Sequence, residues 1–312
     1  VISLHCEEIL SDEQGFALLG QVLRILSEED DIKITRNIVF ALTPIFNQTG
    51  DSWNDLNMLI DNLLKFQDVN KLITVIEILS EYLKYVSSEF LLEILPNIFP
   101  IIERALDSNN IDLVIAGFKL FAGIQNSNAN LIKYAGLFIQ SFQKMVKLFV
   151  NMLIKENNNS HDAANYLAES INPEIPFDSP INLFNMFLQI LQIQDISIYL
   201  RHLALFPLQK IVKYYGSFIR QGFNEAINVL INFSAAQFNG YGFENEEDSH
   251  FIYSIFSKIA QASNSEQIIK SIVQLANSTN EPSYSFAILS AFHGCVDVNI
   301  EQIEVDFDEI IE

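Results

Sequence analysis

The chain has 312 residues and a mass of 35.5 kDa, and its 39 Asp and Glu outnumber its 18 Lys and Arg, giving a formal net charge of −21. This charge argues against nucleic acid as the main partner, because phosphate binding needs clustered Lys and Arg, and it favours a basic protein partner. Hydrophobic residues make up 49% of the chain, which excludes a wholly disordered protein, and 11 Gly and 8 Pro are few for an all-β one.

The cysteines and the apolar stretches restrict the cellular compartment in which the chain is expected. Cys6 and Cys295 stand near opposite ends, so the sequence predicts no disulfide framework and favours a reducing compartment. The longest apolar candidate, 137–154, contains two Gln and two Lys, so no membrane span is expected.

Apolar residues recur at three- and four-residue spacing almost throughout, which predicts a chain of helices. Within 69–86 the apolar face is broad, as expected for a helix covered on two sides. Pro207 should kink or split the helix that contains it, and Ser52, Ser160 and Ser265 are expected helix caps. The expected helices cover 13–27, 32–46, 52–66, 69–86, 89–106, 110–126, 130–155, 160–171, 180–193, 196–215, 217–238, 249–262, 265–278, 282–296 and 300–311.

Helices with no strands between them predict an all-α fold, and their spacing indicates repeats. The first helices of successive pairs begin about 41 residues apart, which is typical of HEAT and armadillo repeats. The sequence therefore predicts a right-handed α-solenoid of about seven to eight HEAT-type helix pairs, a single array over 1–312. The expected units lie near 13–47, 52–86, 89–126, 130–171, 180–215, 217–262, 265–296 and 300–312.

Two further patterns favour the repeat interpretation. Lys133–Gln140 agrees with Lys213–Arg220 at five of eight positions, at an offset of 80 residues or two units. Second helices carry small residues where a neighbouring helix must approach closely. These are Ala41, Ala116, Ala164, Ala204, Ala287 and Ala291.

Four segments resemble parts of a known family. Tyr199–Leu205 is similar to an R-Q-L-A-L second-helix segment, and Ser285–Cys295 is similar to an A-x-L-x-A-L-S-A-I-x-E-G-C segment. Asp51–Leu56 resembles a Trp-containing start of an early first helix, and Phe243–Asp248 resembles an acidic loop. Together these segments resemble the importin-β (karyopherin-β) family of nuclear transport receptors, nearest the importin beta-3 branch, and imply a fragment from the N-terminal half of a longer receptor.

The resemblance implies a function and its partners. The chain is expected to bind basic cargo proteins, Phe-Gly repeats of nucleoporins and the Ran GTPase in its GTP form, which would control cargo release. It is expected to shuttle between cytoplasm and nucleus through the nuclear pore, with no direct contact to nucleic acid or membrane.

An acidic loop is the candidate contact site. Residues 241–312 carry 2 basic and 13 acidic side chains, so more than half of the net charge lies there. In one interpretation the acidic loop 243–248 binds basic groups of cargo or Ran. In the alternative interpretation it is a solvated loop between two helices. The candidate residues are Glu244, Glu246, Glu247 and Asp248.

Motifs of catalysis are not found in the sequence. It has no Gly-rich phosphate loop, no G-x-S-x-G elbow and no His and Cys spacing of a zinc site, so no catalytic, cofactor or metal residues are expected and the chain is not expected to be an enzyme. The alternative function is a HEAT-repeat scaffold or adaptor, of the phosphatase regulatory or chromosome-associated type, with no response to Ran.

Overall fold

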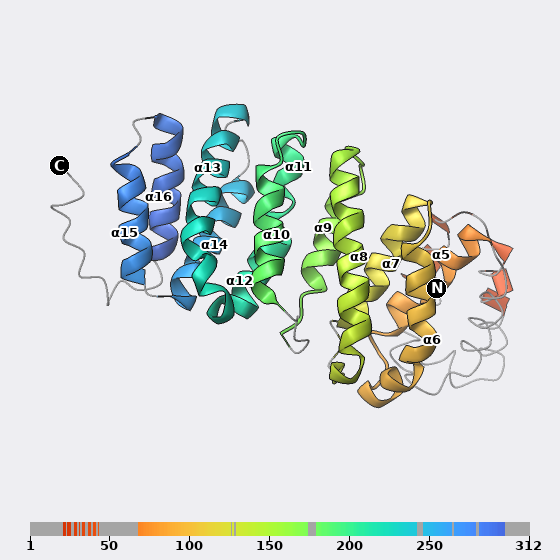
Figure 1. The fold of residues 1–312 in the computed structure, drawn as a ribbon. Helices are drawn as coiled ribbons and strands as arrows, with labels where there is room; N and C mark the ends of the chain where they lie inside the picture. Colours follow the sequence, from red (N-terminus) through yellow and green to blue (C-terminus); the bar gives the residue numbers. More distant parts are fainter. Residues whose placement is uncertain are drawn as a thin grey trace. The chain divides into compact units, whose positions relative to one another are not determined.

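The computed structural model describes most of 68–296 and scattered positions between 21 and 43. Within 68–296 the positions left out are 126, 128, 174–178, 242–245, 264, 279 and 280. The chain divides into two compact units, Val1–Met145 and Val146–Glu312. Throughout the described part the elements are α-helices and short 3₁₀ helices, without strands (Figure 1), so the prediction of an all-α fold is confirmed.

Some predicted elements fall outside this part. The helices expected over 52–66 and 300–311 lie outside the described residues, and those expected over 13–27 and 32–46 lie largely outside them.

The first unit is built around α7 (Ile111–Gln125), which packs against both α5 (Val69–Tyr82) and α6 (Ser88–Leu106). Every residue of α5 from Leu72 to Ser80 is buried, as its broad apolar face predicts. After η3 (Ile132–Tyr134), helix α8 (Ala135–Ile154) brings the Phe138 ring within 4.9 Å of the Phe99 ring and 5.3 Å of the Phe121 ring. These aromatic contacts join α8 to both α6 and α7.

A charged contact also joins α5 to α7. The Lys119 ammonium lies 2.5 Å from the Glu77 carboxylate and 3.8 Å from that of Glu81. The Glu77 side chain is 3% exposed and that of Lys119 is 27% exposed. A buried carboxylate is costly without a cation and hydrogen-bond donors, so this pair constrains how α7 lies on α5.

Helix α6 continues through two prolines, and a neighbouring tyrosine compensates for one of them. Pro96 has no N–H, so it cannot donate the usual helical hydrogen bond to the carbonyl of Leu92. The Tyr134 hydroxyl donates to that carbonyl instead, at 3.3 Å. A side chain 42 residues away in the sequence thus satisfies an acceptor that the helix leaves open.

The second unit continues the same pattern of helices in close succession. Its elements are α9 (Ser160–Glu169), α10 (Pro180–Gln192), α11 (Ile198–His202), α12 (Leu205–Ile219), η4 (Arg220–Gly222), α13 (Phe223–Tyr241), α14 (Glu246–Ala262), α15 (Ser265–Ala276) and α16 (Pro282–Val296).

The helix expected over 196–215 is split into α11 and α12, as Pro207 predicts. Pro207 is the third residue of α12, in the first turn, where its missing N–H has no helical partner to lose. The break expected near residue 216 is wrong, because α12 continues to Ile219 and the break falls at η4. Gly216 does not end the helix; it lies buried within it, against α14.

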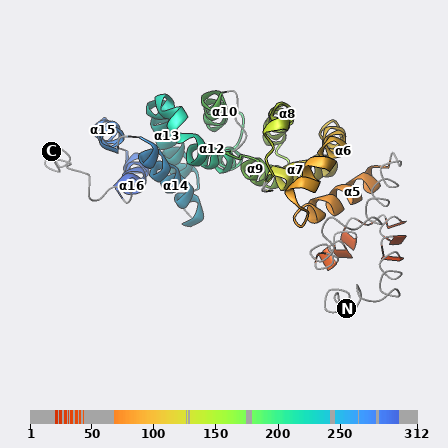
Figure 2. The same ribbon diagram turned by 90° about the horizontal axis from the view of Figure 1, so that it is seen from below.

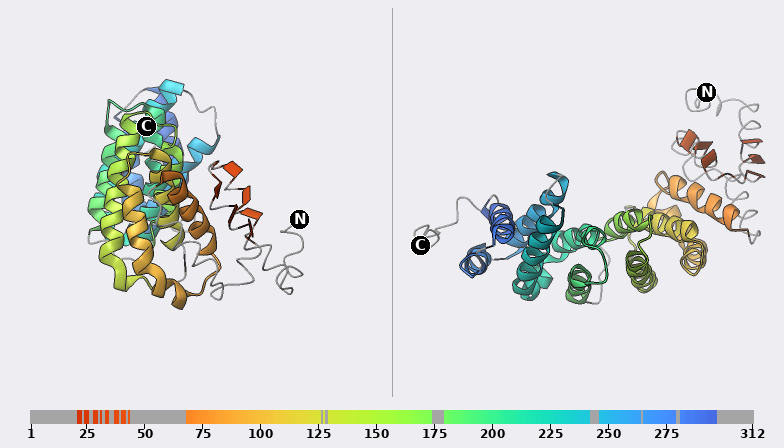
Figure 3. Two further views of the ribbon diagram at one scale, coloured as in Figure 1. Left: turned by 90° about the vertical axis from the view of Figure 1, so that its right-hand side faces the viewer. Right: turned by 90° about the horizontal axis from the view of Figure 1, so that it is seen from above.

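The helices of the second unit lie in two rows. Helices α9, α12, α14 and α16 contact one another in succession, and α10, α13 and α15 do the same. Contacts of α10 with α12, and of α13 and α15 with α16, join the rows. Figure 2 shows the two rows from below and the right-hand view of Figure 3 shows them from above. Ala164, Ala204, Ala287 and Ala291 are fully buried in this packing, as predicted for small second-helix residues.

Several long-range side-chain hydrogen bonds have similar sequence separations. Some in the second unit join groups 35, 39 and 52 residues apart, but others, in each unit, join groups 42 to 45 residues apart. In the first unit these are Lys71 to the Glu29 carbonyl, Lys119 to Glu77 and Tyr134 to the Leu92 carbonyl, all 42 residues apart. In the second unit they are Gln209 to Ser254 (45 apart), Tyr215 to the Asn172 carbonyl (43 apart) and Arg220 to the Ala262 carbonyl (42 apart).

The two similar octapeptides do not occupy equivalent positions. Lys133–Gln140 spans η3 and the start of α8, whereas Lys213–Arg220 ends α12 and enters η4. A Cβ on Gly136 would meet nothing within 4 Å, whereas a Cβ on Gly216 would lie 2.5 Å from the Ala262 Cβ. The match at an offset of 80 residues therefore joins segments that are not structurally equivalent.

Two of the predicted helix caps lie inside their helices and do not precede them. Helix α9 begins at Ser160 itself, and the side chain of the preceding Asn159 makes no capping hydrogen bond. Ser160 is 1% exposed, so its hydroxyl faces the interior. Ser265 is likewise the first residue of α15, and Ser52 lies outside the described residues. Side-chain caps observed among the described residues are Asp68, Ser87, Asn110, Ser179 and Ser197.

Replacing Gly216 with Ala tests the close approach of α12 to α14. The added Cβ overlaps the Ala262 Cβ, so Gly216→Ala should lower the free energy of unfolding by about 1–3 kcal/mol in urea denaturation. Gly136→Ala is the matched control; it meets open space and removes a helical glycine, so stability should be unchanged or rise by up to about 1 kcal/mol. Adding Ala262→Gly to Gly216→Ala should recover part of the loss, and equal effects of the two single changes would contradict the packing.

Replacing Lys119 with Met tests the buried ion pair between α5 and α7. Met keeps the apolar stem but removes the cation that the Glu77 carboxylate contacts, so the free energy of unfolding should fall by about 2 kcal/mol or more. Lys144→Met is the control, because its partner Asp107 is 71% exposed and the loss should stay below about 1 kcal/mol. Urea denaturation gives the loss of unfolding free energy for each variant. A larger loss for Lys144→Met than for Lys119→Met would contradict the expected contribution of the Lys119–Glu77 pair to stability.

Candidate functional site

The acidic candidate residues lie at the border of the described structure. Glu244 falls outside the described residues. Helix α14 begins at Glu246, three residues before the start predicted from the sequence, so Glu246, Glu247 and Asp248 belong to its first turn and not to a loop. Only the backbone of these three residues is described. Acidic residues in a first helical turn interact favourably with the helix dipole, which explains why the helix starts early.

Two of the segments that carry the family resemblance are described, and both take part in packing. Tyr199–Leu205 covers most of α11 and the turn into α12, where Ala204 and Leu205 are fully buried. Ser285–Cys295 lies within α16, and a Cβ on Gly294 would come within 2.6 Å of the Tyr253 carbonyl of α14. Asp51–Leu56 lies outside the described residues, as do 243–245 of the fourth segment.

Arg201 binds the end of a neighbouring helix. One guanidinium nitrogen donates to the Leu191 carbonyl of α10 at 2.9 Å. This carbonyl is among the last of α10, where helical donors are missing and a cation is favoured by the helix dipole. Burial lowers the pKa of Arg201. The residue therefore positions α11 against α10.

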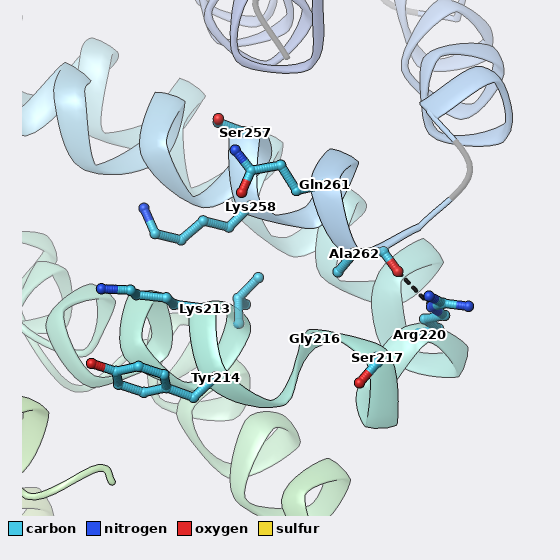
Figure 4. A pocket seen from close by; sticks show the side chains of 10 residues that line it. Lys213, Tyr214, Gly216, Ser217, Arg220, Ser257, Lys258, Gln261 and Ala262 are labelled. Carbon is cyan, nitrogen blue, oxygen red and sulfur yellow. Dashed lines mark hydrogen bonds between the residues drawn. The ribbon is translucent and has the colours of Figure 1, made fainter. Parts of the chain in front are cut away.

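A pocket opens between α12 and α14. It encloses about 410 Å³, and its lining includes Lys213, Tyr214 and Ser217 from α12, Arg220 from η4, and Ser257, Lys258 and Gln261 from α14. Figure 4 shows the amine ends of Lys213 and Lys258 and the Tyr214 hydroxyl at one end of the pocket, with Arg220 at the other. Gly216 and Ala262 lie between them, where the two helices come closest.

The cationic side chains of this pocket are held in place by neutral groups. The Lys258 ammonium donates to the Ser254 hydroxyl at 2.5 Å, and Gln209 donates to the same hydroxyl at 2.7 Å. The Lys213 ammonium lies 5.1 Å from the centroid of the Tyr214 ring, within range of a cation–π contact. The Arg220 Nε donates to the Ala262 carbonyl at 2.5 Å, at the last residue of α14.

Burial and like charges both act on Lys258. Burial lowers the pKa of Lys258, and the positive charges of Lys213 and Lys210 lower it further. Within the described part of the chain, no ion pair involves Lys210, Lys213, Lys258 or Arg220. The sequence pattern does not indicate this pocket. Lys213 and Arg220 lie in 181–240, where basic residues (4) outnumber acidic ones (2), but Lys258 lies beyond that stretch.

The described residues offer little for nucleophilic or metal chemistry. No group of three or more His, Cys, Asp or Glu is arranged to hold a metal ion among them. The Cys295 thiol is buried against α14 with its Sγ 3.9 Å from the Phe256 carbonyl, and burial raises its pKa to about 12. A thiol with so high a pKa is not a nucleophile near neutral pH.

One helical stretch among the described residues, Ile132–Ile154, is long and apolar enough to cross a membrane by length and composition alone. Core helices of ordinary globular proteins also meet this criterion. Here Phe138 packs against α6 and α7, and Lys144 forms an ion pair with Asp107. These contacts are those of a helix packed within the protein, and charged residues in the middle of a membrane span are costly.

Comparison with models of known protein families finds no match, and comparison with curated proteins finds none either.

The buried thiol gives a direct test of the α14–α16 contact. With Cys6→Ser leaving Cys295 as the single thiol, labelling by a thiol reagent at pH 8 should be at least about 100-fold slower in the native protein than in urea. Because burial raises the thiol pKa from 9.0 to about 12, its contribution to stability is present below pH 9 and should be lost as the pH rises from 9 to about 12. Equal labelling rates in the two states would contradict the burial.

Proposed function

We propose that the chain is a right-handed α-solenoid of about seven to eight HEAT-type helix pairs. The two rows of helices in the second unit support this, as do the hydrogen bonds between groups about 42 residues apart in each unit. A single helix pair cannot bury both of its apolar faces, so pairs of this kind are stable only when stacked. α7 and α12 have this character, because each packs against more than one other helix.

We further propose that this array is part of a nuclear transport receptor of the importin-β type. It binds basic cargo proteins and the Phe-Gly repeats of nucleoporins, releases cargo when the GTP form of Ran binds, and shuttles between cytoplasm and nucleus. The observation that carries this proposal is the combination of repeated helix pairs with a formal net charge of −21. Stacked helices present a large surface, and its negative charge attracts Lys- and Arg-rich partners.

Glu244, Glu246, Glu247 and Asp248 are the proposed contacts for basic cargo or Ran. In the sequence, Glu244 lies between the long helices α13 and α14, and the other three are the first residues of α14. Each exposed ion pair contributes about 0.2–1 kcal/mol, so affinity must arise from several such contacts acting together.

The test is fluorescence anisotropy with a labelled Lys- and Arg-rich localisation peptide at two salt concentrations. The proposal expects binding that weakens with salt and is reversed by GTP-loaded Ran but not by GDP-loaded Ran. Replacing the four acidic residues by Gln or Asn should weaken peptide binding about tenfold, because four contacts of this kind are lost together.

The matched control removes four charges elsewhere, from Glu28, Glu29, Asp30 and Asp31, and should change binding less than twofold. Equal weakening by both sets would show attraction by net charge alone and would remove the assigned contact site. Peptide binding that GTP-loaded Ran does not reverse would favour the alternative, a HEAT-repeat scaffold or adaptor. Absence of binding at low salt would contradict the cargo proposal itself.

A further inference from the structure

The α12–α14 pocket is unusual for the charge of its lining. In a chain with 39 acidic and 18 basic side chains, cations that come together are expected to have carboxylates nearby. Here Lys213, Arg220 and Lys258 line one pocket, and Lys210 is close enough to act on Lys258. None of the lining residues that the structure describes is Asp or Glu.

The positive charges of the pocket are not offset within the described structure. Lys258 donates to a serine hydroxyl and Lys213 lies over a tyrosine ring, and neither contact neutralises a charge. Burial and the neighbouring lysines disfavour the charged form of Lys258, so its pKa is lowered. An anion in the pocket would reverse this unfavourable interaction, because an opposite charge nearby stabilises the ammonium.

The uncharged polar side chains of the lining are hydrogen-bond donors suited to oxygen-rich ligands. Hydroxyls of Tyr214, Ser217 and Ser257 and the amide of Gln261 stand beside the cations. The volume of about 410 Å³ falls in the range of small-ligand sites, which is roughly 300–1,000 Å³. Ammonium and guanidinium groups together with hydroxyls are the usual ligands of phosphoryl oxygens, which carry more charge per volume than a single carboxylate.

We propose that the pocket between α12 and α14, lined by Lys213, Lys258 and Arg220, binds a phosphoryl-bearing anion. Lys213 and Lys258 contact the phosphoryl oxygens at one end, where Tyr214 also points, and Arg220 attracts a second negative group at the other end. This proposal is independent of basic cargo binding, because it assigns a ligand of opposite charge to a different set of residues.

Isothermal titration calorimetry of the full chain with pyrophosphate tests the site. The double variant Lys213→Gln/Lys258→Gln should weaken binding at least tenfold. The matched control, Lys147→Gln/Lys155→Gln, removes the same charge from exposed positions of the same unit and should stay within twofold of the unchanged protein. Thermal melting of each variant monitored by circular dichroism establishes that it is folded.

Proton exchange on binding is a second readout, which would not change if Lys258 had a purely structural role. Calorimetry in alkaline buffers of different ionisation enthalpy gives the number of protons exchanged on pyrophosphate binding. The unchanged protein should take up more protons than Lys258→Gln at the same pH, because the bound anion raises the lowered pKa of Lys258; protons exchanged by pyrophosphate itself are common to both. Lys155→Gln should match the unchanged protein, and equal proton exchange in the unchanged protein and Lys258→Gln would place the anion away from Lys258 and overturn the proposed site.

Two further titrations separate the sources of the phosphoryl group. Binding of pyrophosphate that depends on the two lysines indicates a small phosphorylated molecule, and lysine-dependent binding of a doubly phosphorylated serine peptide without pyrophosphate binding indicates a modified partner protein. A peptide with Glu in place of both phosphoserines should bind at least tenfold more weakly than the phosphorylated one. Equal binding of the two peptides, equal weakening by both double variants, or no binding of either phosphoryl probe would overturn the proposal.

Discussion

The close contact between helices that lie about 42 residues apart in the sequence, such as α12 with α14 and α14 with α16, is the constraint on which the rest of the described structure depends. Helices α12 and α14 meet where Gly216 faces Ala262, and a single extra methyl group there would overlap its neighbour. Helices α14 and α16 meet where Gly294 faces the Tyr253 carbonyl. Interiors are packed closely enough that the loss or gain of one carbon is felt, so such positions fix the distance between successive helices.

The same close approach organises polar groups. Where helices of successive pairs touch, side chains reach across to backbone carbonyls, as Tyr134 does at Leu92 and Arg220 at Ala262. It also places Lys213 and Lys258 at one end of a shared pocket, although they are 45 residues apart in the sequence. The packing that stabilises the helices thus creates the concentration of positive charge in an otherwise acidic chain.

Local features of the fold could be predicted from the sequence because they depend on neighbouring residues. Apolar spacing predicts where α5, α6, α7 and α16 lie to within about four residues, and Pro207 predicts the split between α11 and α12. The break near residue 216 could not be predicted correctly, since a buried glycine and a helix-ending glycine look alike in a sequence. Ser160 failed as a cap for a related reason: its hydroxyl is directed inward by packing that the local sequence does not contain.

The candidate site was harder to predict, because its residues come together only through packing between helices. Lys213 and Lys258 lie on different helices, and the excess of basic residues over 181–240 includes Lys213 but not Lys258. The match of Lys133–Gln140 with Lys213–Arg220 does not reflect equivalent positions, since one segment starts a helix and the other ends one. The spacing of apolar residues therefore predicted the helices, whereas this octapeptide match did not predict a structural equivalence.

Hydrogen exchange followed by mass spectrometry tests the central claim most directly. If contacts between second helices hold each unit together, amides of α7 should exchange more slowly than those of α6, and amides of α12 and α14 more slowly than those of α10 and α15. The protected segments of the second unit should then recur at about the helix-pair spacing of 42 residues. Faster exchange in α12 and α14 than in α10 and α15 would contradict the account.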